Sequence, residues 1–250
     1  MLSRLIVEIA SNEILGPELA FRGGTCLHKL HLPTALRYSE DLDNVRQTAT
    51  PGGPIIDQLR KLTTAMGLEE HHRKLKQDMI TFICRAQGEN GGVIRIKIET
   101  NIAEAAPFLE RIRLPYSVNS PWFEGAAEVS TFELDELMST KMRALYQRSK
   151  GRDLFDLWHV LVARDVDDER VVSGLRHYMQ DATFTYPQLA QNIRGKLEDP
   201  EFANDLQSLV VRMPSGYDLQ AAADILMERL GARLHNAPPL DEIRDGAWRK

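Results

Sequence analysis

The sequence is poor in the features that mark secreted, membrane-spanning and strongly basic proteins. Among 250 residues there are two cysteines, Cys26 and Cys84, with neither metal-ligand spacing nor a disulfide framework. No apolar run approaches the roughly 20 residues that a transmembrane helix needs. The net charge of −5 argues against a generally basic surface, although it leaves room for a local basic patch. We therefore expect a cytoplasmic protein with buried, reduced thiols and no membrane association.

Apolar periodicity divides the chain into a mixed first half and a helical second half. Ile94, Ile96 and Ile98 alternate with polar residues, which predicts a strand over 93–99, joined to a strand over 79–85 by a glycine-rich turn. The irregular stretch 103–127 contains three prolines and is expected to lack regular structure. Helical spacing predicts helices at 1–14, 25–32, 55–66, 133–148, 152–164, 168–180, 186–197, 201–211 and 217–231.

These patterns predict an α+β fold in which a mixed α/β part precedes a helical C-terminal part. We expect an α/β catalytic core over 1–130 and a mostly helical domain over 131–236 that completes the site. The remaining residues, 237–250, begin with Pro238-Pro239 and are expected to form a flexible tail.

Two short motifs in the first half point to a site for a triphosphate and a metal. Asp41 and Asp43 are two residues apart, so on a strand both carboxylates project from one face and can share Mg²⁺ ions. Upstream, Gly23 and Gly24 lack a Cβ, which lets backbone N–H groups approach a phosphate. Thr25 lies where a helix would begin, and helix N-termini favour anions.

A second cluster of charge lies near the middle of the chain. The stretch Lys141–Arg152 contains five basic residues and no acid, and it leads into Asp153 and Asp156. Asp153 is placed to cap the next helix. Simpler interpretations exist for each feature: a solvated helix face for the basic run, a cap for Asp153, an Arg152–Asp156 pair at i,i+4, and an ordinary exposed strand residue for Glu99.

In combination these motifs resemble a known family. The order Phe-Arg-Gly-Gly-Thr-Cys-Leu, Arg-Tyr-Ser-Glu-Asp-Leu-Asp, Ile-Lys-Ile-Glu and Arg-Asp-Leu-Phe-Asp-Leu is similar to that of the AbiEii/AbiGii toxins, which include the MenT toxins. That family belongs to the DNA polymerase β-like nucleotidyltransferase superfamily. The resemblance covers about residues 20 to 165, and Arg22 stands where lysine is more usual. It implies a nucleotidyltransferase-like mixed sheet with flanking helices.

The resemblance also implies a role for each matching residue. Asp41 and Asp43 would bind Mg²⁺ or Mn²⁺, and Glu99 takes the place of a third strand carboxylate. Lys141 would neutralise the phosphates, and Asp153 would be the acidic residue of the last motif. The residues expected to bind the nucleotide are Gly23, Gly24, Thr25, Ser39 and Lys141. The residues expected to bind the acceptor through its phosphates are Arg143, Arg148, Lys150 and Arg152.

The expected activity is transfer of a nucleoside monophosphate from an NTP to an RNA acceptor, with the tRNA 3′ end as first choice. The resemblance further implies a bacterial toxin with a cognate antitoxin and a role in phage defence. Three alternatives stay open: a small-molecule or protein acceptor on the same fold, a glycosyltransferase using Asp-x-Asp, and a non-catalytic binding protein. The Gly-Gly-Thr turn and the absence of an initial βαβ pattern argue against the glycosyltransferase, and the intact carboxylates with Lys141 argue against the binding protein.

Overall fold

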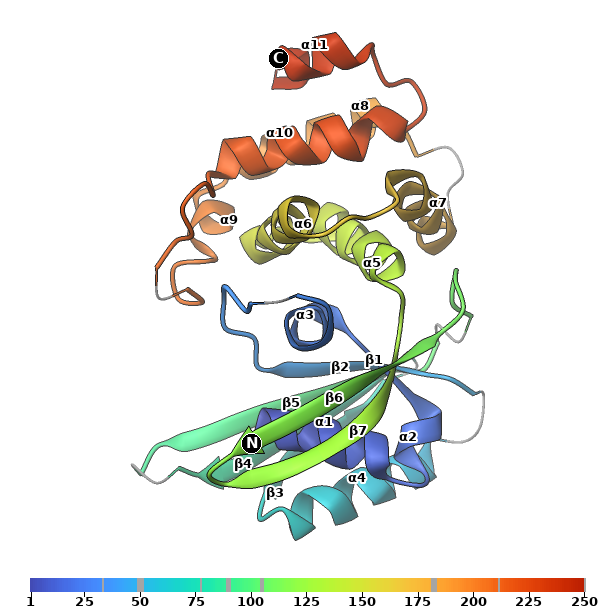
Figure 1. Ribbon diagram of the computed structural model, residues 1–250, viewed down its shortest axis with the longest axis vertical. Helices are drawn as coiled ribbons and strands as arrows, with labels where there is room; N and C mark the ends of the chain where they lie inside the picture. The colour runs from blue at the N-terminus through green and yellow to red at the C-terminus, as the bar shows by residue number, and fades with distance from the viewer. Residues whose placement is uncertain are drawn as a thin grey trace. The chain divides into compact units, whose positions relative to one another are not determined.

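A computed structural model describes residues 1–32, 34–48, 52–76, 78–88, 91–103, 106–180, 184–210 and 212–249. The chain forms two compact units, each with its own core (Figure 1). Unit 1 comprises Met1–His31 and Ser39–Glu133, and unit 2 comprises Leu32–Tyr38 and Leu134–Lys250. The chain therefore enters unit 2 briefly at 32–38, returns to unit 1, and leaves it for good after 133.

Unit 1 is built on a seven-stranded sheet with the order β3-β4-β5-β2-β1-β7-β6. Two central pairs, β2 with β5 and β1 with β7, are parallel, and the remaining pairs are antiparallel. Of the alternating isoleucines of β5, Ile96 and Ile98 are buried, as the pattern predicts, whereas Ile94 near the start of the strand is exposed. The strands are β1 Leu19–Arg22, β2 Asp41–Arg46, β3 Glu69–Leu75, β4 Met79–Gln87, β5 Val93–Asn101, β6 Ile112–Ser120 and β7 Phe123–Thr131.

Helices cover both faces of this sheet. In Figure 1, α1 (Leu2–Ser11), α2 (Leu15–Glu18) and α4 (Gly53–Ala65) lie on one face, and α3 (Gly23–Cys26) lies on the other. A π-helical turn, η1 (Leu27–His31), continues α3, so this helix begins two residues before the predicted start at Thr25. Both cysteines are buried free thiols, which confirms the expectation from their apolar surroundings.

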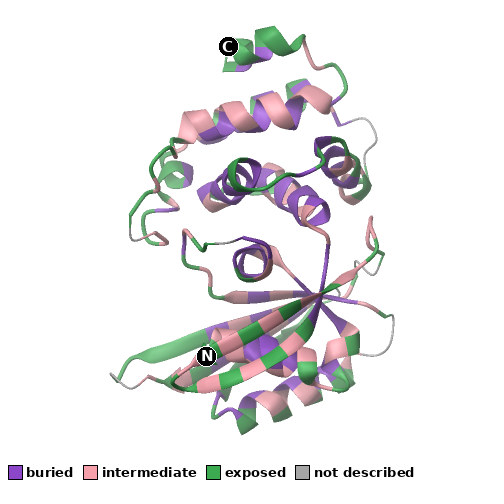
Figure 2. Ribbon diagram, in the orientation of Figure 1, coloured by how far each residue is buried: buried purple, intermediate pink, exposed green. Residues whose placement is uncertain are grey.

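The hairpin β6–β7 contradicts the prediction that 103–127 is irregular. Ile112, Leu114, Tyr116 and Val118 alternate with exposed residues, and the alternation is visible along the hairpin in Figure 2. Pro115 masks this signal in the sequence, because proline is usually excluded from strands. It is tolerated here because β6 is an edge strand, where one missing N–H donor costs no ladder bond on the open side.

Unit 2 is helical. Its central helices agree with the predicted ranges to within about two residues at each end, whereas α9 is shorter than predicted. Within 237–250, which is expected to form a flexible tail, the structure has a further helix and a 3₁₀ turn whose Ile243 and Trp248 are buried. The elements are α5 Leu134–Gln147, α6 Gly151–Ala163, α7 Asp168–Met179, α8 Tyr186–Leu197, α9 Pro200–Asn204, α10 Leu219–Arg229, η2 Gly231–Arg233, α11 Leu240–Arg244 and η3 Ala247–Arg249.

The mixed sheet with flanking helices, followed by a helical part, is the α+β arrangement that the sequence predicts. Within the described part of the chain, no helix is long and apolar enough to cross a lipid bilayer. The turn predicted between β4 and β5 is described only in part, because residues 89–90 lie outside the described ranges.

Candidate functional site

The carboxylates of Asp41 and Asp43 lie on one face of β2 in unit 1. Strand β2 runs parallel to β5, and its register places Asp41 beside Lys97 and Asp43 beside Glu99. Residues paired in register share a face, so all four side chains gather on the face that also carries α3. The Asp41 carboxylate is 40% exposed, which leaves it open to a ligand. The strand geometry predicted for the Asp-x-Asp pair is therefore present.

Lys97 is the residue of this cluster that sequence reasoning missed. Its Nζ lies 2.9 Å from Asp41 Oδ2 and 3.0 Å from Glu99 Oε2, so one ammonium group bridges two carboxylates. Burial alone would lower the pKa of Lys97, but hydrogen bonds to Asp41 and Glu99 outweigh it and raise the pKa above its ordinary value. Lys97 therefore stays protonated and occupies the position of a cation between these oxygens. Only the register of two strands distant in sequence reveals it.

The glycine turn lies directly against the second aspartate. Gly23 has a φ of +81°, and a Cβ built there would come within 2.2 Å of Asp43 Oδ2. A side chain at position 23 would thus meet both backbone strain and a steric clash with the carboxylate. Glycine is required here, and its absent side chain is what lets Asp43 lie against the start of α3.

We expect Gly23→Ala to destabilise the fold by roughly 1–3 kcal/mol and to weaken metal binding by displacing Asp43. Urea unfolding and a titration with Mn²⁺ measure the two effects. Gly195→Ala in α8 is the matched control, because a Cβ there meets no atom within 4 Å. That substitution is expected to stabilise the fold by about 0.5–1 kcal/mol. A Gly23→Ala variant as stable as the control variant would contradict the clash.

Thr25 and Ser39, both predicted to bind the nucleotide, lie within hydrogen-bond distance of each other. Thr25 is buried, and its Oγ1 donates to the Asp41 carbonyl oxygen at 2.6 Å and lies 2.8 Å from Ser39 Oγ. These contacts hold the backbone just before β2 in place. The side chain of Thr25 thus positions Asp41. That the backbone of this turn holds the triphosphate stays a prediction.

In unit 2, Lys141 on α5 faces two carboxylates of α6. Its Nζ lies 3.2 Å from Asp153 Oδ1 and 2.9 Å from Asp156 Oδ2. Arg148, just after α5, donates to both oxygens of Asp153 at 2.7 and 2.9 Å. Asp153 and Asp156 are one helical turn apart, which brings both carboxylates to the same face of α6.

The opposing charges hold this cluster ionised although it is buried. Burial disfavours the charged form of Asp153, but Lys141 and Arg148 outweigh it and lower the pKa of that carboxyl. Burial likewise disfavours charged Lys141, whereas Asp156 and Asp153 raise the pKa of its ammonium group. These contacts favour the charged form of Lys141.

Asp156 and Arg37 were not predicted as members of this cluster. The Arg37 guanidinium donates through Nε and Nη2 to the two oxygens of Asp156, at 2.7 and 2.6 Å, and both side chains are almost fully buried. The interpretation of Asp156 as a partner of Arg152 is thus wrong. Arg37 comes from the 32–38 excursion, which Tyr38 also anchors by donating its N–H to the Leu209 carbonyl oxygen at 2.6 Å.

The residues expected to bind the acceptor are largely engaged within unit 2. Arg148 pairs with Asp153, whereas Lys150 and Arg152 lie 3.7 and 3.3 Å from Asp205 Oδ1. Arg143 lies over the ring of Tyr178 and donates to its carbonyl oxygen. Their side chains are partly exposed, and their role in acceptor binding stays a prediction.

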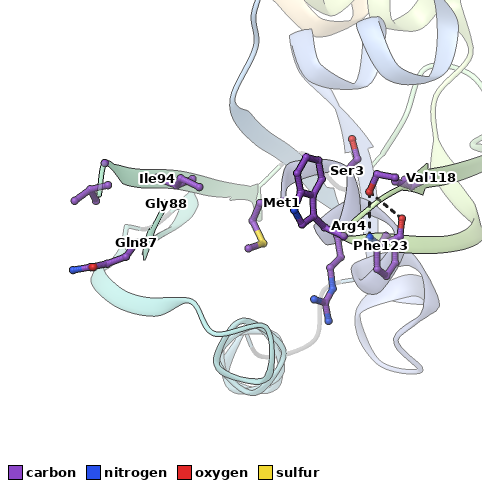
Figure 3. Close-up of a pocket in the computed structure, with 12 residues that line it drawn as sticks. Met1, Ser3, Arg4, Gln87, Gly88, Ile94, Val118 and Phe123 are labelled. Atoms are coloured by element: carbon purple, nitrogen blue, oxygen red, sulfur yellow. Dashed lines mark hydrogen bonds between the residues drawn. The ribbon is translucent and has the colours of Figure 1, made fainter. Parts of the chain in front are cut away.

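A separate cavity of about 790 Å³ lies in unit 1. Figure 3 shows it between Gly88 and Ile94 of the β4–β5 hairpin and Val118 and Phe123 of the β6–β7 hairpin, with Met1 of the N-terminal segment in the middle. None of the predicted site residues lines it. The cavity is therefore not the place of the predicted chemistry.

The donor set of unit 1 suits a divalent cation bound jointly with a substrate. Asp41 and Asp43 supply hard oxygen ligands of the kind Mg²⁺ prefers, and Lys97 already places a positive charge at the same oxygens. Among the described residues, no group of three or more histidine, cysteine or acidic side chains is arranged to hold a metal ion. Phosphate oxygens of a bound NTP would complete such a site.

The profile of the nucleotidyl transferase AbiEii toxin family, a type IV toxin–antitoxin system, matches residues 4–240. The chain belongs to this family. The match extends well beyond the motifs at 20–165 and includes most of unit 2. AbiEii membership makes the chain a nucleotidyltransferase toxin of a toxin–antitoxin system, and the two charged clusters lie on the motifs by which the sequence resembles the family.

A solved structure shares the fold of this chain. The chain is similar to the nucleotidyltransferase toxin MenT4 of Mycobacterium tuberculosis, with a TM-score of 0.59 at 16% identity over 99% of this chain and 86% of that one. An antigenic nucleotidyltransferase-like protein from Paracoccidioides brasiliensis aligns with a TM-score of 0.41 at 17% identity, over 76% of this chain and 89% of that one. No curated protein sequence matches the chain.

Proposed function

We propose that this AbiEii protein transfers a nucleoside monophosphate from an NTP to an RNA acceptor, the tRNA 3′ end, with Mg²⁺ or Mn²⁺ as cofactor. Asp41 and Asp43 are the metal ligands, and Lys141 neutralises the phosphates. The observation that carries the proposal is the pair of carboxylates on one face of β2, held against the Gly23 turn.

The proposed residues take different parts in the chemistry. A bound divalent cation would supply Lewis-acid activation of the attacking hydroxyl and neutralise charge on the departing pyrophosphate. Asp41 and Asp43 would hold that cation, which would compete with Lys97 for Asp41 Oδ2. Lys141 keeps its charge because Asp153 and Asp156 flank it, and those two carboxylates orient its ammonium group. The protein thus acts by positioning and electrostatics.

The toxin family further supports a cognate antitoxin as the protein partner. An NTP and a tRNA acceptor would place the reaction in the cytoplasm. A second candidate acceptor, a protein or small molecule, is favoured by one observation: Arg148, Lys150 and Arg152 already have carboxylate partners within unit 2. The assay below separates the two acceptor classes.

We expect label from one of the four α-³²P-labelled NTPs to appear in tRNA when the protein is incubated with total tRNA and Mg²⁺. Addition of EDTA should abolish the transfer, and excess Mn²⁺ should restore it, because both ions take oxygen ligands. Denaturing gels report the labelled species. Label that appears in protein or in a small molecule, and never in tRNA, would replace the RNA acceptor by the second candidate.

A further inference from the structure

The face of the sheet that carries Asp41 and Asp43 continues across β5, β4 and β3 as an exposed basic surface. The register of the strands defines its members. Between β5 and β4, Lys97 is opposite Ile83 and Arg95 is opposite Arg85. Thr81 of β4 lies between Glu99 of β5 and Lys74 of β3. Because directly paired residues point to one side, these side chains share the face of the catalytic carboxylates. We call Lys74, Arg85 and Arg95, all exposed, the basic strand face.

Arg85 and Arg95 form an unfavourable pair in the protein alone. They are directly opposite each other on antiparallel strands, where Cβ atoms are about 5 Å apart and like charges destabilise the pairing. Glu69 is opposite Arg85 on β3, but makes no ion pair with it. Within the described part of the chain, no side chain forms a hydrogen bond or ion pair with Lys74, Arg85 or Arg95. Two unpaired like charges side by side in an acidic protein indicate an anionic ligand.

This arrangement contrasts with the basic run of unit 2. Arg148, Lys150 and Arg152 are each within 4 Å of a carboxylate, so an RNA phosphate would have to compete with an existing partner. The guanidinium groups of Arg85 and Arg95 have no such partner among the described residues. They can bind phosphate without breaking an ion pair, and release of counterions from RNA adds to the gain.

The spacing of Arg95 and Arg85 in the basic strand face suits a chain of phosphates that leads toward the metal site. Strands are about 4.8 Å apart and residues rise about 3.3 Å, which places Arg95 about 8 Å, and Arg85 about 12 Å, from Asp41 in the plane of the sheet. Lys74 is three strands from Asp43, or about 14 Å. Arg95 and Arg85 thus lie at increasing distances from Asp41 toward the hairpin end of β5 and β4, which Figure 2 colours as exposed. Lys74 lies in the row of Asp43, in the opposite direction along the strands.

We propose that the basic strand face binds the phosphates of the RNA acceptor strand next to its reacting 3′ end. The inference rests on the proposed function, since it names where that acceptor binds. Arg85 and Arg95 act together as a phosphate clamp, and Lys74 adds positive charge to the same face. Arginine suits this role because its planar donors bind a phosphate through two hydrogen bonds.

The test compares Arg85→Ala/Arg95→Ala with Lys61→Ala/Arg73→Ala. The control removes the same charge from unit 1, but Arg73 pairs with buried Phe82 on the opposite face and Lys61 lies on α4, which covers that face. Labelled tRNA is titrated by fluorescence anisotropy over a salt series, and NTP binding is measured by calorimetry. We expect the double variant to bind tRNA roughly tenfold more weakly, with a log–log salt slope shallower by about 1.4. NTP affinity should stay unchanged, and the control should behave like wild type.

The outcomes separate the inference from the proposed function. If wild type labels tRNA but the Arg85→Ala/Arg95→Ala variant keeps its tRNA affinity and salt slope, the basic strand face is not the acceptor site, and the function stands. Equal losses in the Lys61→Ala/Arg73→Ala control would also overturn the inference. If wild type never labels RNA, the proposed function itself fails. Thermal unfolding gives a further check: relief of the Arg85–Arg95 contact should not lower the melting temperature, and a clear decrease would refute the like-charge argument.

Discussion

Replacement of Asp41 or Asp43 by asparagine is expected to lower turnover by at least about a thousandfold, because the loss of a metal-binding carboxylate removes several kcal/mol of transition-state stabilisation. Both substitutions keep the shape of the side chain and the backbone of β2. Asp41 is partly exposed and pairs with Lys97, so its removal should change the free energy of unfolding by less than about 1 kcal/mol. Single-turnover transfer of labelled NMP measures the activity.

Asp57→Asn is the matched control for these variants. Asp57 lies on α4 and pairs loosely with Arg60 at 3.6 Å, so its loss should leave turnover unchanged. Mn²⁺ titration of each variant separates a ligand from a bystander: Asp41→Asn and Asp43→Asn should lose Mn²⁺ affinity, and Asp57→Asn should keep it. Near-wild-type turnover in either β2 variant would remove that residue from the metal site.

Arg37→Ala is expected to reduce the free energy of unfolding by about 3–5 kcal/mol, because it leaves the buried Asp156 without its bidentate partner. Lys141 contacts one oxygen of Asp156 but also serves Asp153, so it cannot replace two guanidinium hydrogen bonds. Arg37→Lys should retain part of the stability, since a point charge remains without the planar fork. Urea unfolding followed by circular dichroism gives the values.

The control for Arg37 is Arg152→Ala. Arg152 also pairs with an aspartate, Asp205, but its side chain is 34% exposed, so we expect a loss of no more than about 1 kcal/mol. Equal losses in the free energy of unfolding for the two variants would show that burial does not make the Arg37–Asp156 pair more stabilising than an exposed one. A loss confined to Arg37→Ala would establish the 32–38 excursion as part of the core of unit 2.

Local patterns predicted the parts of this protein that local physics determines. The alternation in β5 and the helical spacing of α5 to α8 follow from which side of each element is buried. The order of apolar and polar residues within each element indicates that side. The two-residue spacing of Asp41 and Asp43 likewise needs only a strand to place them on one face. Pro115 hid β6 because an edge strand relaxes the rule against proline, and edge position is a property of the whole sheet.

Contacts between distant segments were not predictable from the same patterns. Arg37 and Asp156 are 119 residues apart, and nothing near either one indicates the other. Lys97 reaches Asp41 only because β2 and β5 are parallel neighbours in a particular register. β3 has no buried side chain, so hydrophobic periodicity carries no information about it. In each case the missing information is the topology of the sheet or the docking of a loop.

The excursion at 32–38 has a consequence for how the chain is made and dissected. During synthesis, unit 1 can fold once residue 133 has emerged, while Arg37 must wait for α6 before its guanidinium finds Asp156. A fragment expressed from residue 134 onward would contain every helix of unit 2 and still lack an arginine from its core. A cut at the boundary near residue 133 would therefore yield a helical fragment in which the buried carboxylate of Asp156 lacks its arginine. Adding residues 32–38 as a separate peptide would restore Arg37 as its partner.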